Sequence, residues 1–460
     1  MCLRSLLAEM TFDRVFKRFV FSTFVLLALA LPLLLASCGK EHRHEWGEWE
    51  PYIESTCYVA GQERSLCSCG AAKYRRVALA HEFELSKTDI SKRTMLMVCS
   101  KCGAEEEREL TAEAAHITLV TIGDGMITVE AGGSSYTASA ENYGSDSYRF
   151  TLNEGAASLA DGAGEYSEYI LSPGYLDNVA SRKAIAEDLY GNVVLSGDPA
   201  DPISSALNGG AGAGYPVAAY RGKEYIGICT LYPFTNGTLL GMTDGGNRAA
   251  LLAEQYSDQA ALRAVISAPT EENGFRVLYA AEGFGNDAIV QSFNDMITFI
   301  GENDWNAFKD GLAAHVDIDR AIDEMLFTCT VGAVDCITAN KLWVTYDGTR
   351  WIPVPYNLDY SFADVAMEPD QASNLLWEKF NLYFIEETNA RWRDLRFGSL
   401  SLDAIEQTVR AHFDKIPEEA LRLDEDLASQ VSESVEPAVA VIMENVNANL
   451  ARLDVYFGLQ

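Results

Sequence analysis

The chain has 460 residues, of which 48% are hydrophobic, so it can form two or three domains with sizeable cores. Its formal net charge of -32 at pH 7 argues against nucleic acid and anionic lipid head groups as primary partners, because both would be repelled. A chain this acidic can bind phosphates only through a local basic pocket or a bridging metal ion.

Residues 1–37 have the features of an export signal. Basic side chains between Arg4 and Arg18 precede an apolar run at 19–35, and small residues lead from there to Cys38. This ending resembles a bacterial lipobox, which implies cleavage before Cys38 and acylation of that cysteine as a lipid anchor. A membrane-spanning segment is the alternative, because the run is just long enough to cross a bilayer. Either way we expect attachment to the cell membrane on its extracytoplasmic face.

The segment 38–116 carries two short Cys/His units that repeat each other. In each unit a histidine is followed by an acidic and an aromatic residue, and later by two cysteines that end in a glycine. Paired cysteines of this kind can aim two thiolates at one ion, and a histidine can complete a tetrahedral zinc site. The predicted ligand sets are Cys57, Cys67 and Cys69 with His44 or His81, and Cys99 and Cys102 with His81 or His116.

This segment resembles small zinc-ribbon-like repeats in surface proteins of anaerobic bacteria. We expect Zn²⁺ in a structural role, since a site filled by protein ligands leaves no open position for chemistry. Disulfides are the alternative, because an exported chain permits them. The five cysteines between residues 42 and 116 cannot all pair with one another, and the recurring histidines have no role in a disulfide framework, so the pattern favours the metal.

From residue 117 to residue 460 the pattern predicts one α+β domain. Its first half should contain a hairpin at 117–135, a strand at 148–152, a helix at 177–189 and a hairpin around 221–223. The glycine-rich stretch 209–214 lacks the lysine of a P-loop and is predicted to be a flexible connector. Residues 250–312 should be mostly helical and irregular. After residue 362 helices are predicted at 375–395, 401–416, 420–434 and 437–457.

The stretch 335–362 carries the pattern with the most chemical content. Asp317 can cap a helix that begins at Ile318 and leads to Asp335. Two aromatic and β-branched runs, 341–346 and 350–354, then flank Asp-Gly, which predicts a hairpin. If Tyr346 faces Thr349, Asn340 falls opposite Pro355 and the chain returns past the loop 335–340 at Asp359.

Protein kinases present their catalytic aspartate and two Mg²⁺ ligands in this order, an Asp, an Asn five residues later and a second Asp. Asp335, Asn340 and Asp359 therefore form a candidate phosphoryl-transfer site. The alternative is that they are turn and cap residues, which Asp and Asn often are.

Together these stretches resemble the CotH kinase family, atypical protein kinases first recognised in spore-coat assembly. The resemblance covers roughly residues 117–420 and rests on 148–152, 171–189, 221–228, 316–322, 335–340 and 355–362. It implies an atypical protein-kinase-like domain with a helical C-terminal part, and ATP and Mg²⁺ as cofactors. It also implies Asp335 as the catalytic aspartate, Asn340 and Asp359 as metal ligands, Arg182 as a structural or phosphate-side residue, and Asn357 where the family has the first aspartate of Asp-Leu-Asp.

Two functions remain open at this point. The chain is a surface kinase that transfers phosphate from ATP to Ser or Thr of exported proteins, or it is a catalytically degenerate relative that acts as a binding or assembly module at the cell surface. The acids retained in the stretch 335–362 are consistent with both.

Overall fold

The structure is a computed structural model that describes residues 43–144, 147–160, 162–173, 181–242, 245–302, 305–363, 367–428 and 435–459. The described residues form two compact units: 43–84 with 98–105, and 85–97 with 106–459. Whereas the sequence pattern predicts a border after residue 116, the structure assigns 85–97 and 106–116 to the second unit. Within the described ranges no helix has the length and apolarity needed to cross a bilayer. The predicted signal segment and Cys38 lie outside these ranges.

The first unit is built from short antiparallel strands with few buried side chains. Strands β1 (Glu50–Ile53), β2 (Gly61–Leu66) and β3 (Ala72–Val77) form one sheet. Strands β4 (Phe83–Asp89), β5 (Thr94–Cys99) and β6 (Glu105–Glu109) form another, and the border between the units runs through them. All four residues of β1 are exposed, so burial of apolar surface contributes little here. Small domains of this kind commonly depend on disulfides or metal ions.

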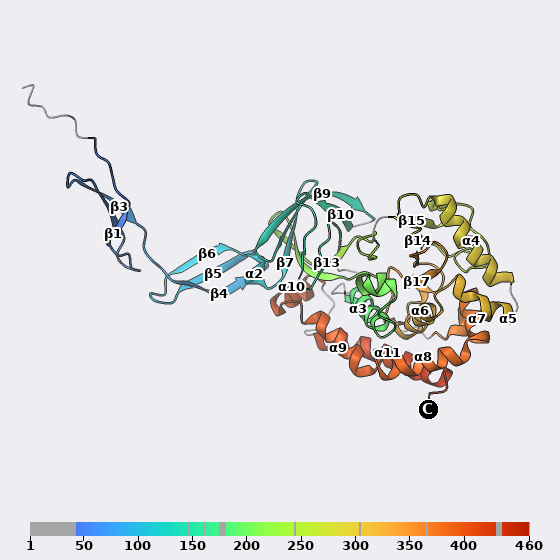
Figure 1. Ribbon diagram of the computed structural model, residues 1–460. Helices are drawn as coiled ribbons and strands as arrows, with labels where there is room; N and C mark the ends of the chain where they lie inside the picture. Colours follow the sequence, from blue (N-terminus) through green and yellow to red (C-terminus); the bar gives the residue numbers. More distant parts are fainter. Residues whose placement is uncertain are drawn as a thin grey trace, which may run out of the picture. The chain divides into compact units, whose positions relative to one another are not determined.

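After its share of β4, β5 and β6, the second unit continues with α2 (Ala112–Ala115) and a closed β-barrel (Figure 1). Around the barrel the strand order is β10-β11-β13-β12-β7-β8-β9, and only β7 and β12 pair in parallel. The bounds are β7 (Thr118–Ile122), β8 (Met126–Ala131), β9 (Ser134–Tyr143), β10 (Ser147–Leu152), β11 (Glu168–Pro173), β12 (Tyr215–Arg221) and β13 (Glu224–Pro233). Its own apolar core, which includes Val120, Phe150 and Leu231, fills the interior. The hairpins predicted at 117–135 and around 221–223, and the strand at 148–152, are confirmed.

A second sheet has the order β15-β14-β16-β17, with bounds β14 (Ala249–Ala253), β15 (Phe275–Ala280), β16 (Lys341–Thr345) and β17 (Trp351–Pro355). The prediction that 250–312 is mostly helical and irregular misses β14 and β15. The reason is local: the sequence Ala-Ala-Leu-Leu-Ala of β14 is buried on both faces and therefore does not alternate, and its residues all favour helices in isolation.

Helices surround this sheet, and α6 lies between β17 and α11 (Figure 1). The α-helices are α3 (Ser181–Leu195), α4 (Asn286–Glu302), α5 (Trp305–Gly311), α6 (Ile318–Val331), α7 (Leu375–Tyr383), α8 (Ile385–Phe397), α9 (Leu402–Phe413), α10 (Glu418–Ala428) and α11 (Val435–Tyr456). Short 3₁₀ turns are η1 (Pro202–Ser205), η2 (Leu207–Gly210), η3 (Glu271–Asn273), η4 (Leu312–Ala314), η5 (Val334–Cys336) and η6 (Pro369–Gln371). The predicted C-terminal helices are confirmed over the described residues, except that 375–395 is two helices divided at Phe384. Residues 429–434 of the helix predicted at 420–434 lie outside the described ranges.

The glycine-rich stretch 209–214 is buried rather than a flexible connector, so that prediction is wrong. A Cβ built on Gly214 would lie 2.7 Å from Ala184 on α3 and from Thr230 on β13. Gly209, with φ +63, would place its Cβ 2.5 Å from Val194. These glycines allow the loop to pack directly against α3, which fixes that helix beside the barrel.

Candidate functional site

Helix α6 positions the loop that carries Asp335. Asp317 caps its first turn by accepting a hydrogen bond from the Arg320 N–H at 3.2 Å, as the sequence predicts, and Gly332 ends it in the left-handed conformation with φ 68°. Twelve consecutive residues of the helix, 320–331, are buried. Asp335, which lies in the 3₁₀ turn η5, therefore directly follows a rigid helix.

The hairpin after this loop forms, but its register differs by one residue from the predicted one. Lys341 pairs with Pro355 and Thr345 with Trp351, so Asn340 lies beside Tyr356 rather than opposite Pro355. The cause is the turn: the Asp347 carboxylate accepts hydrogen bonds from the N–H groups of Thr349 and Arg350, both at 2.8 Å. These contacts hold a longer loop than the Asp-Gly pair alone requires.

Asp335, Asn340 and Asp359 are brought together at the far end of this hairpin. The Asn340 side-chain amide donates to Asp335 Oδ2 at 2.9 Å. The Tyr356 N–H donates to the Asn340 carbonyl at 2.8 Å, which ties the returning strand to the loop. Asp359 follows two residues after Asn357, is exposed, and lies near enough for its charge to act on Asp335. Asp335 and Asn340 are therefore in direct contact, and Asp359 lies within electrostatic range of Asp335.

The two asparagines also have a backbone role. Asn340 and Asn357 both adopt positive φ, 46° and 56°, a region in which asparagine is enriched among residues other than glycine. Asn357 makes the turn that buries Leu358 and exposes Asp359. The turn-residue interpretation of these positions thus applies alongside the ligand interpretation.

Burial raises the pKa of Asp335, and the negative charge of Asp359 raises it further. The hydrogen bond from Asn340 acts in the opposite direction but does not reverse the shift. A carboxyl group whose pKa is raised toward neutrality is suited to accept a proton from a hydroxyl group.

Two further charged side chains at this site come from α3. Glu187 is 2% exposed, and its pKa is well above the usual value because of burial, although Lys183 one turn earlier lowers it. Burial lowers the pKa of Lys183, but the carboxylates of Glu187 and Asp359 outweigh this and raise it. The Lys183 ammonium also lies 4.3 Å from the ring centroid of Tyr232. Lys183 and Glu187 therefore belong to the same electrostatic cluster as Asp359.

Sequence reasoning selected Arg182 and missed Lys183 and Glu187. Arg182 lies in the first turn of α3, half-buried and directly before Lys183. The available signal was a Lys and a Glu four residues apart in a helix whose next residues, such as Ala184 and Ile185, are apolar and buried.

The cluster lies where the barrel meets the second sheet. Tyr356, after β17, is influenced by Lys183, by Tyr143 at the end of β9 and by Arg276 on β15. Arg276 itself forms an ion pair with Glu254 at 2.6 Å. Burial lowers the pKa of Arg276, but its hydrogen bond with Tyr143 raises it overall. Barrel, sheet and α3 thus all contribute side chains to one polar region.

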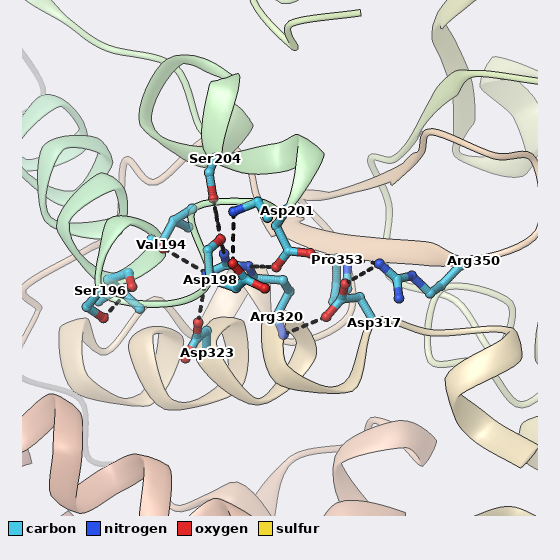
Figure 2. A network of polar contacts seen from close by, with 12 residues as sticks. Val194, Ser196, Asp198, Asp201, Ser204, Asp317, Arg320, Asp323, Arg350 and Pro353 are labelled. Atoms are coloured by element: carbon cyan, nitrogen blue, oxygen red, sulfur yellow. Dashed lines mark hydrogen bonds and ion pairs between the residues drawn. The ribbon is translucent and has the colours of Figure 1, made fainter. Parts of the chain in front are cut away.

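A different polar network surrounds the first turns of α6 (Figure 2). Arg320 is 1% exposed; its guanidinium donates to Asp201 Oδ2 at 2.9 Å, the Val194 carbonyl at 2.8 Å and the Asp198 carbonyl at 3.0 Å. It also pairs with Asp323, 3.3 Å away. This network joins α6 to the end of α3 and to the loop before η1.

Two more arginines complete this network. Arg391 on α8 donates to Asp323 Oδ2 at 3.1 Å, and Arg350 in the hairpin turn pairs with Asp317 at 3.0 Å. The acids Asp201, Asp317 and Asp323 are thereby matched by three arginines. We call these six side chains the arginine network; its role is to fix α6.

A buried ion pair adjoins Asn340. Lys341 Nζ lies 2.9 Å from Glu324 Oε1, with side-chain exposures of 1% and 0%. The ammonium also lies 4.8 Å from the ring centroid of Trp377. The Lys341 side chain therefore holds β16 on α6 and is not directed toward a ligand.

The first unit contains two groups of metal-ligating atoms. Cys57, His81, Cys99 and Cys102 offer ligand atoms that all lie within 4.8 Å of one another, and His44, Cys67 and Cys69 form a second such group. Cys57 therefore joins the second cysteine pair, whereas the sequence pattern grouped it with Cys67 and Cys69. No disulfide joins two of the eight cysteines in the described ranges.

The cysteine sulfur atoms lie at short distances within these groups. Cys57 Sγ is 3.6 Å from Cys99 Sγ, and Cys102 Sγ is 3.3 Å from His81 Nδ1. Burial raises the pKa of Cys99, but the N–H groups of Lys101 and Cys102 and the His81 side chain outweigh it and lower the value to about 6. A thiol with this pKa supplies the thiolate that metal ions bind.

His116 is the one proposed ligand that the structure places elsewhere. It ends α2 in the left-handed conformation with φ 53° and belongs to the second unit. There it lines a cavity of about 880 Å³ together with Glu113, Tyr215 and Lys415. This cavity is separate from the cluster around Asp335, none of whose residues line it.

The fold and the site define a mixed α+β protein whose barrel, second sheet and helices converge on a carboxylate-rich polar site. A family model described as CotH kinase protein matches residues 133–450, which include that site. The chain therefore belongs to the CotH kinase protein family. The matched range begins just before β9 and does not include the Cys/His units. No curated protein matches the chain.

Proposed function

We propose that this chain transfers the terminal phosphoryl group of ATP to a hydroxyl group on another protein. The observation that carries the proposal is the convergence of Asp335, Asn340 and Asp359 beside Lys183, in a chain that belongs to the CotH kinase protein family. Phosphoryl transfer needs position and charge more than covalent chemistry from the protein, and this cluster supplies both.

The side chains fit Mg²⁺ and a nucleotide. Mg²⁺ prefers oxygen ligands, which the carboxylate of Asp359 and the amide of Asn340 can provide. Glu187 Oε2 is buried without a hydrogen-bond partner among the described residues, so a bound cation would give this oxygen a partner. When bound, Mg²⁺ and ATP would supply the transferable group and neutralise its charge.

Each residue then has a distinct role. Asp335, whose pKa is raised, would accept the proton of the acceptor hydroxyl group, while Asn340 holds its carboxylate in place. Asp359 and Asn340 would hold the metal ion. Lys183 would contact the phosphates, with Glu187 fixing the position of its ammonium group.

The second candidate is a binding or assembly protein without catalysis. The positive φ angles of Asn340 and Asn357 favour it, because these residues then have a structural reason to be present. Asn357 also stands where the family has an aspartate, and an amide binds Mg²⁺ more weakly than a carboxylate does.

Location and metal content complete the proposal. The signal-like segment 1–37 and the cysteine at position 38 support a lipid-anchored protein on the extracytoplasmic face of the membrane, with exported or surface proteins as partners. The four ligands Cys57, His81, Cys99 and Cys102 support a structural Zn²⁺, because three sulfur atoms and one nitrogen form a closed tetrahedral set.

The test measures nucleotide binding and transfer separately on the full chain, purified in mild detergent. With Mg²⁺ and ATP at 100 times Kd, we expect the melting temperature to rise by about 3 °C. Radiolabel from ATP should reach the chain itself or dephosphorylated casein. Asp335→Asn should abolish transfer but keep the thermal shift, whereas Asp359→Asn should reduce the shift.

Asp319→Asn is the matched control, because Asp319 is an exposed aspartate in the first turn of α6 and should change neither measurement. If ATP with Mg²⁺ or Mn²⁺ changes neither melting temperature nor labelling, the kinase proposal is wrong and the binding module is favoured.

A further inference from the structure

The last turn of helix α6, which leads directly into the loop of Asp335, is bonded to two other segments. The last four carbonyl groups of an α-helix have no partner within the helix. In α6 the Val331 carbonyl accepts a hydrogen bond from the Phe362 N–H at 2.6 Å. The Thr330 carbonyl accepts one from the Asn449 side-chain amide of α11 at 3.1 Å. The start of the Asp335 loop is therefore tied both to α11 and to the segment that ends at Phe362.

Phe362, which closes the segment of Asp359, is held by a second amide of α11. Its carbonyl accepts a hydrogen bond from the Asn445 side chain at 2.9 Å. Phe362 is buried and has φ 61°, a conformation that a bulky residue adopts only where the surrounding contacts hold it. Both backbone polar groups of Phe362 are therefore bonded, one to α6 and one to α11, and the segment that carries Asp359 has a fixed end.

Asn445 and Asn449 lie on one face of α11, because residues four apart in a helix are neighbours. This helix packs against α6. Asn449 is 4% exposed, and the Arg452 guanidinium donates to its Oδ1 at 3.3 Å, which leaves the amide NH₂ group for the Thr330 carbonyl. Asn447, between the two, is exposed. One face of a single helix therefore holds the backbone on both sides of the candidate site.

We propose that α11 positions the carboxylates of the candidate site: Asn445 fixes the segment of Asp359, and Asn449 fixes the end of α6 that leads to Asp335. Both asparagines are positioning residues, because they act through backbone carbonyls and touch neither metal ion nor substrate. This inference rests on the proposed function, and it adds that α11 sets the separation between the proton-accepting and the metal-binding carboxylate. Such separations matter, since a misplacement of about 1 Å can lower a rate about 100-fold.

Two variants of the full chain in mild detergent separate the two contacts. Asn445→Leu should raise the Kd for Mn²⁺, measured by electron paramagnetic resonance, about tenfold, because Asp359 loses its fixed position. Asn449→Leu should lower the rate of radiolabel transfer at saturating Mg²⁺ and ATP about tenfold, while its Kd for Mn²⁺ stays within about twofold. Asn447→Leu, on the exposed side of the same helix, should change neither quantity. A merely structural role would not divide metal affinity from rate in this way.

Hydrogen–deuterium exchange of the unmodified chain provides a test that does not depend on the variants folding. Mn²⁺ with ATP should slow exchange at 331–337, at 356–362 and in α11 more than in β8 of the barrel, because bonded segments are stabilised together. Protection of the two loops without a greater effect in α11 than in β8 overturns the inference and leaves phosphoryl transfer standing. So do variants that match Asn447→Leu, or that each lose affinity and rate equally. An unmodified chain that binds no Mn²⁺ and transfers no label overturns both.

Discussion

Helix α6 connects two acidic regions that differ in how their charges are balanced. At its start, Asp201, Asp317 and Asp323 are matched by three arginines in the arginine network. Beyond its end, the carboxylates of Glu187, Asp335 and Asp359 outnumber Lys183, the cation whose charge acts on Glu187. In the first region each acidic side chain has an arginine partner within the chain. In the second, among the described residues, the acidic side chains outnumber this lysine.

The difference separates structure from function on physical grounds. Buried acids that are paired and hydrogen-bonded hold elements in place, and removing one partner is costly. Acids that repel one another inside a partly buried region reduce stability, and such arrangements are found where a ligand or proton compensates for them.

Replacing Arg320 should cause the greatest loss of stability. Arg320→Met would take one arginine partner from Asp201 and one from Asp323, and it would leave the Val194 and Asp198 carbonyls without this donor, at a cost of about 3–5 kcal/mol. Urea denaturation of the second unit, followed by tryptophan fluorescence, measures this. Arg393→Met, which changes an exposed arginine on α8, should stay within about 0.5 kcal/mol. A loss below about 1 kcal/mol for Arg320→Met would show that the arginine network does not stabilise the fold as proposed.

When the stability of the two acidic regions is measured at low pH, the contribution of His412 to the free energy of unfolding must be subtracted. This side chain is 1% exposed, neither ring nitrogen has a hydrogen-bond partner among the described residues, and burial lowers its pKa to about 3. Below pH 6.5 His412 becomes protonated in the unfolded chain but stays neutral in the folded chain. The free energy of unfolding therefore decreases as the pH is lowered. The expected loss between pH 7 and pH 4.5 is about 3 kcal/mol.

His412→Leu should remove this pH dependence and leave only the titration of the acids. Urea midpoints for both proteins between pH 7 and pH 4.5 provide the measurement. Parallel curves for the two proteins would show that His412 is protonated in the folded chain and that the assignment is incorrect.

Asp335→Asn should have the smallest effect, and of the opposite sign. The pKa of Asp335 is higher in the folded chain than in the unfolded chain, where it is 3.8. The protonated carboxyl group therefore favours folding at low pH, and this stabilisation is lost as the pH rises through the pKa of the folded chain. At pH 7 the ionised group therefore costs stability, and asparagine should restore up to about 1 kcal/mol. Burial raises the pKa of Asp323 in the arginine network as well, but two arginines depend on its carboxylate. Asp323→Asn should therefore lose about 3 kcal/mol, since it leaves a buried guanidinium group without its charged partner. Equal losses for both substitutions would contradict the contrast.

Elements with strong local signals could be predicted from the sequence. The cap at Asp317, the helical spacing after it and the Asp-Gly turn identify α6 and the hairpin, because these signals depend on neighbours in the chain. The hairpin register could not be fixed in this way, since the Asp347 carboxylate adds contacts that extend the turn. β14 was missed because a strand buried on both faces loses its alternation.

The candidate site was predictable where it lies within one stretch and not where distant segments meet. Asp335, Asn340 and Asp359 fall within 25 residues of sequence. Lys183 and Glu187 come from a helix about 150 residues earlier, which packs against α6 and the buried glycine loop. Likewise Cys57 joins the second cysteine pair because of how the strands fold, which cysteine spacing alone does not determine.

Two hydrogen bonds join segments at opposite ends of the second unit's sequence. Glu419 on α10 accepts hydrogen bonds from Thr88 Oγ1 at 3.0 Å and from the Ile90 N–H at 3.1 Å, across 331 and 329 positions of the chain. Residues near the beginning of the second unit cannot complete their bonding until translation has passed residue 419. A ribosome that stops earlier leaves this end of the unit unfinished, so premature termination near the C-terminus should expose the nascent protein to proteases at its opposite end.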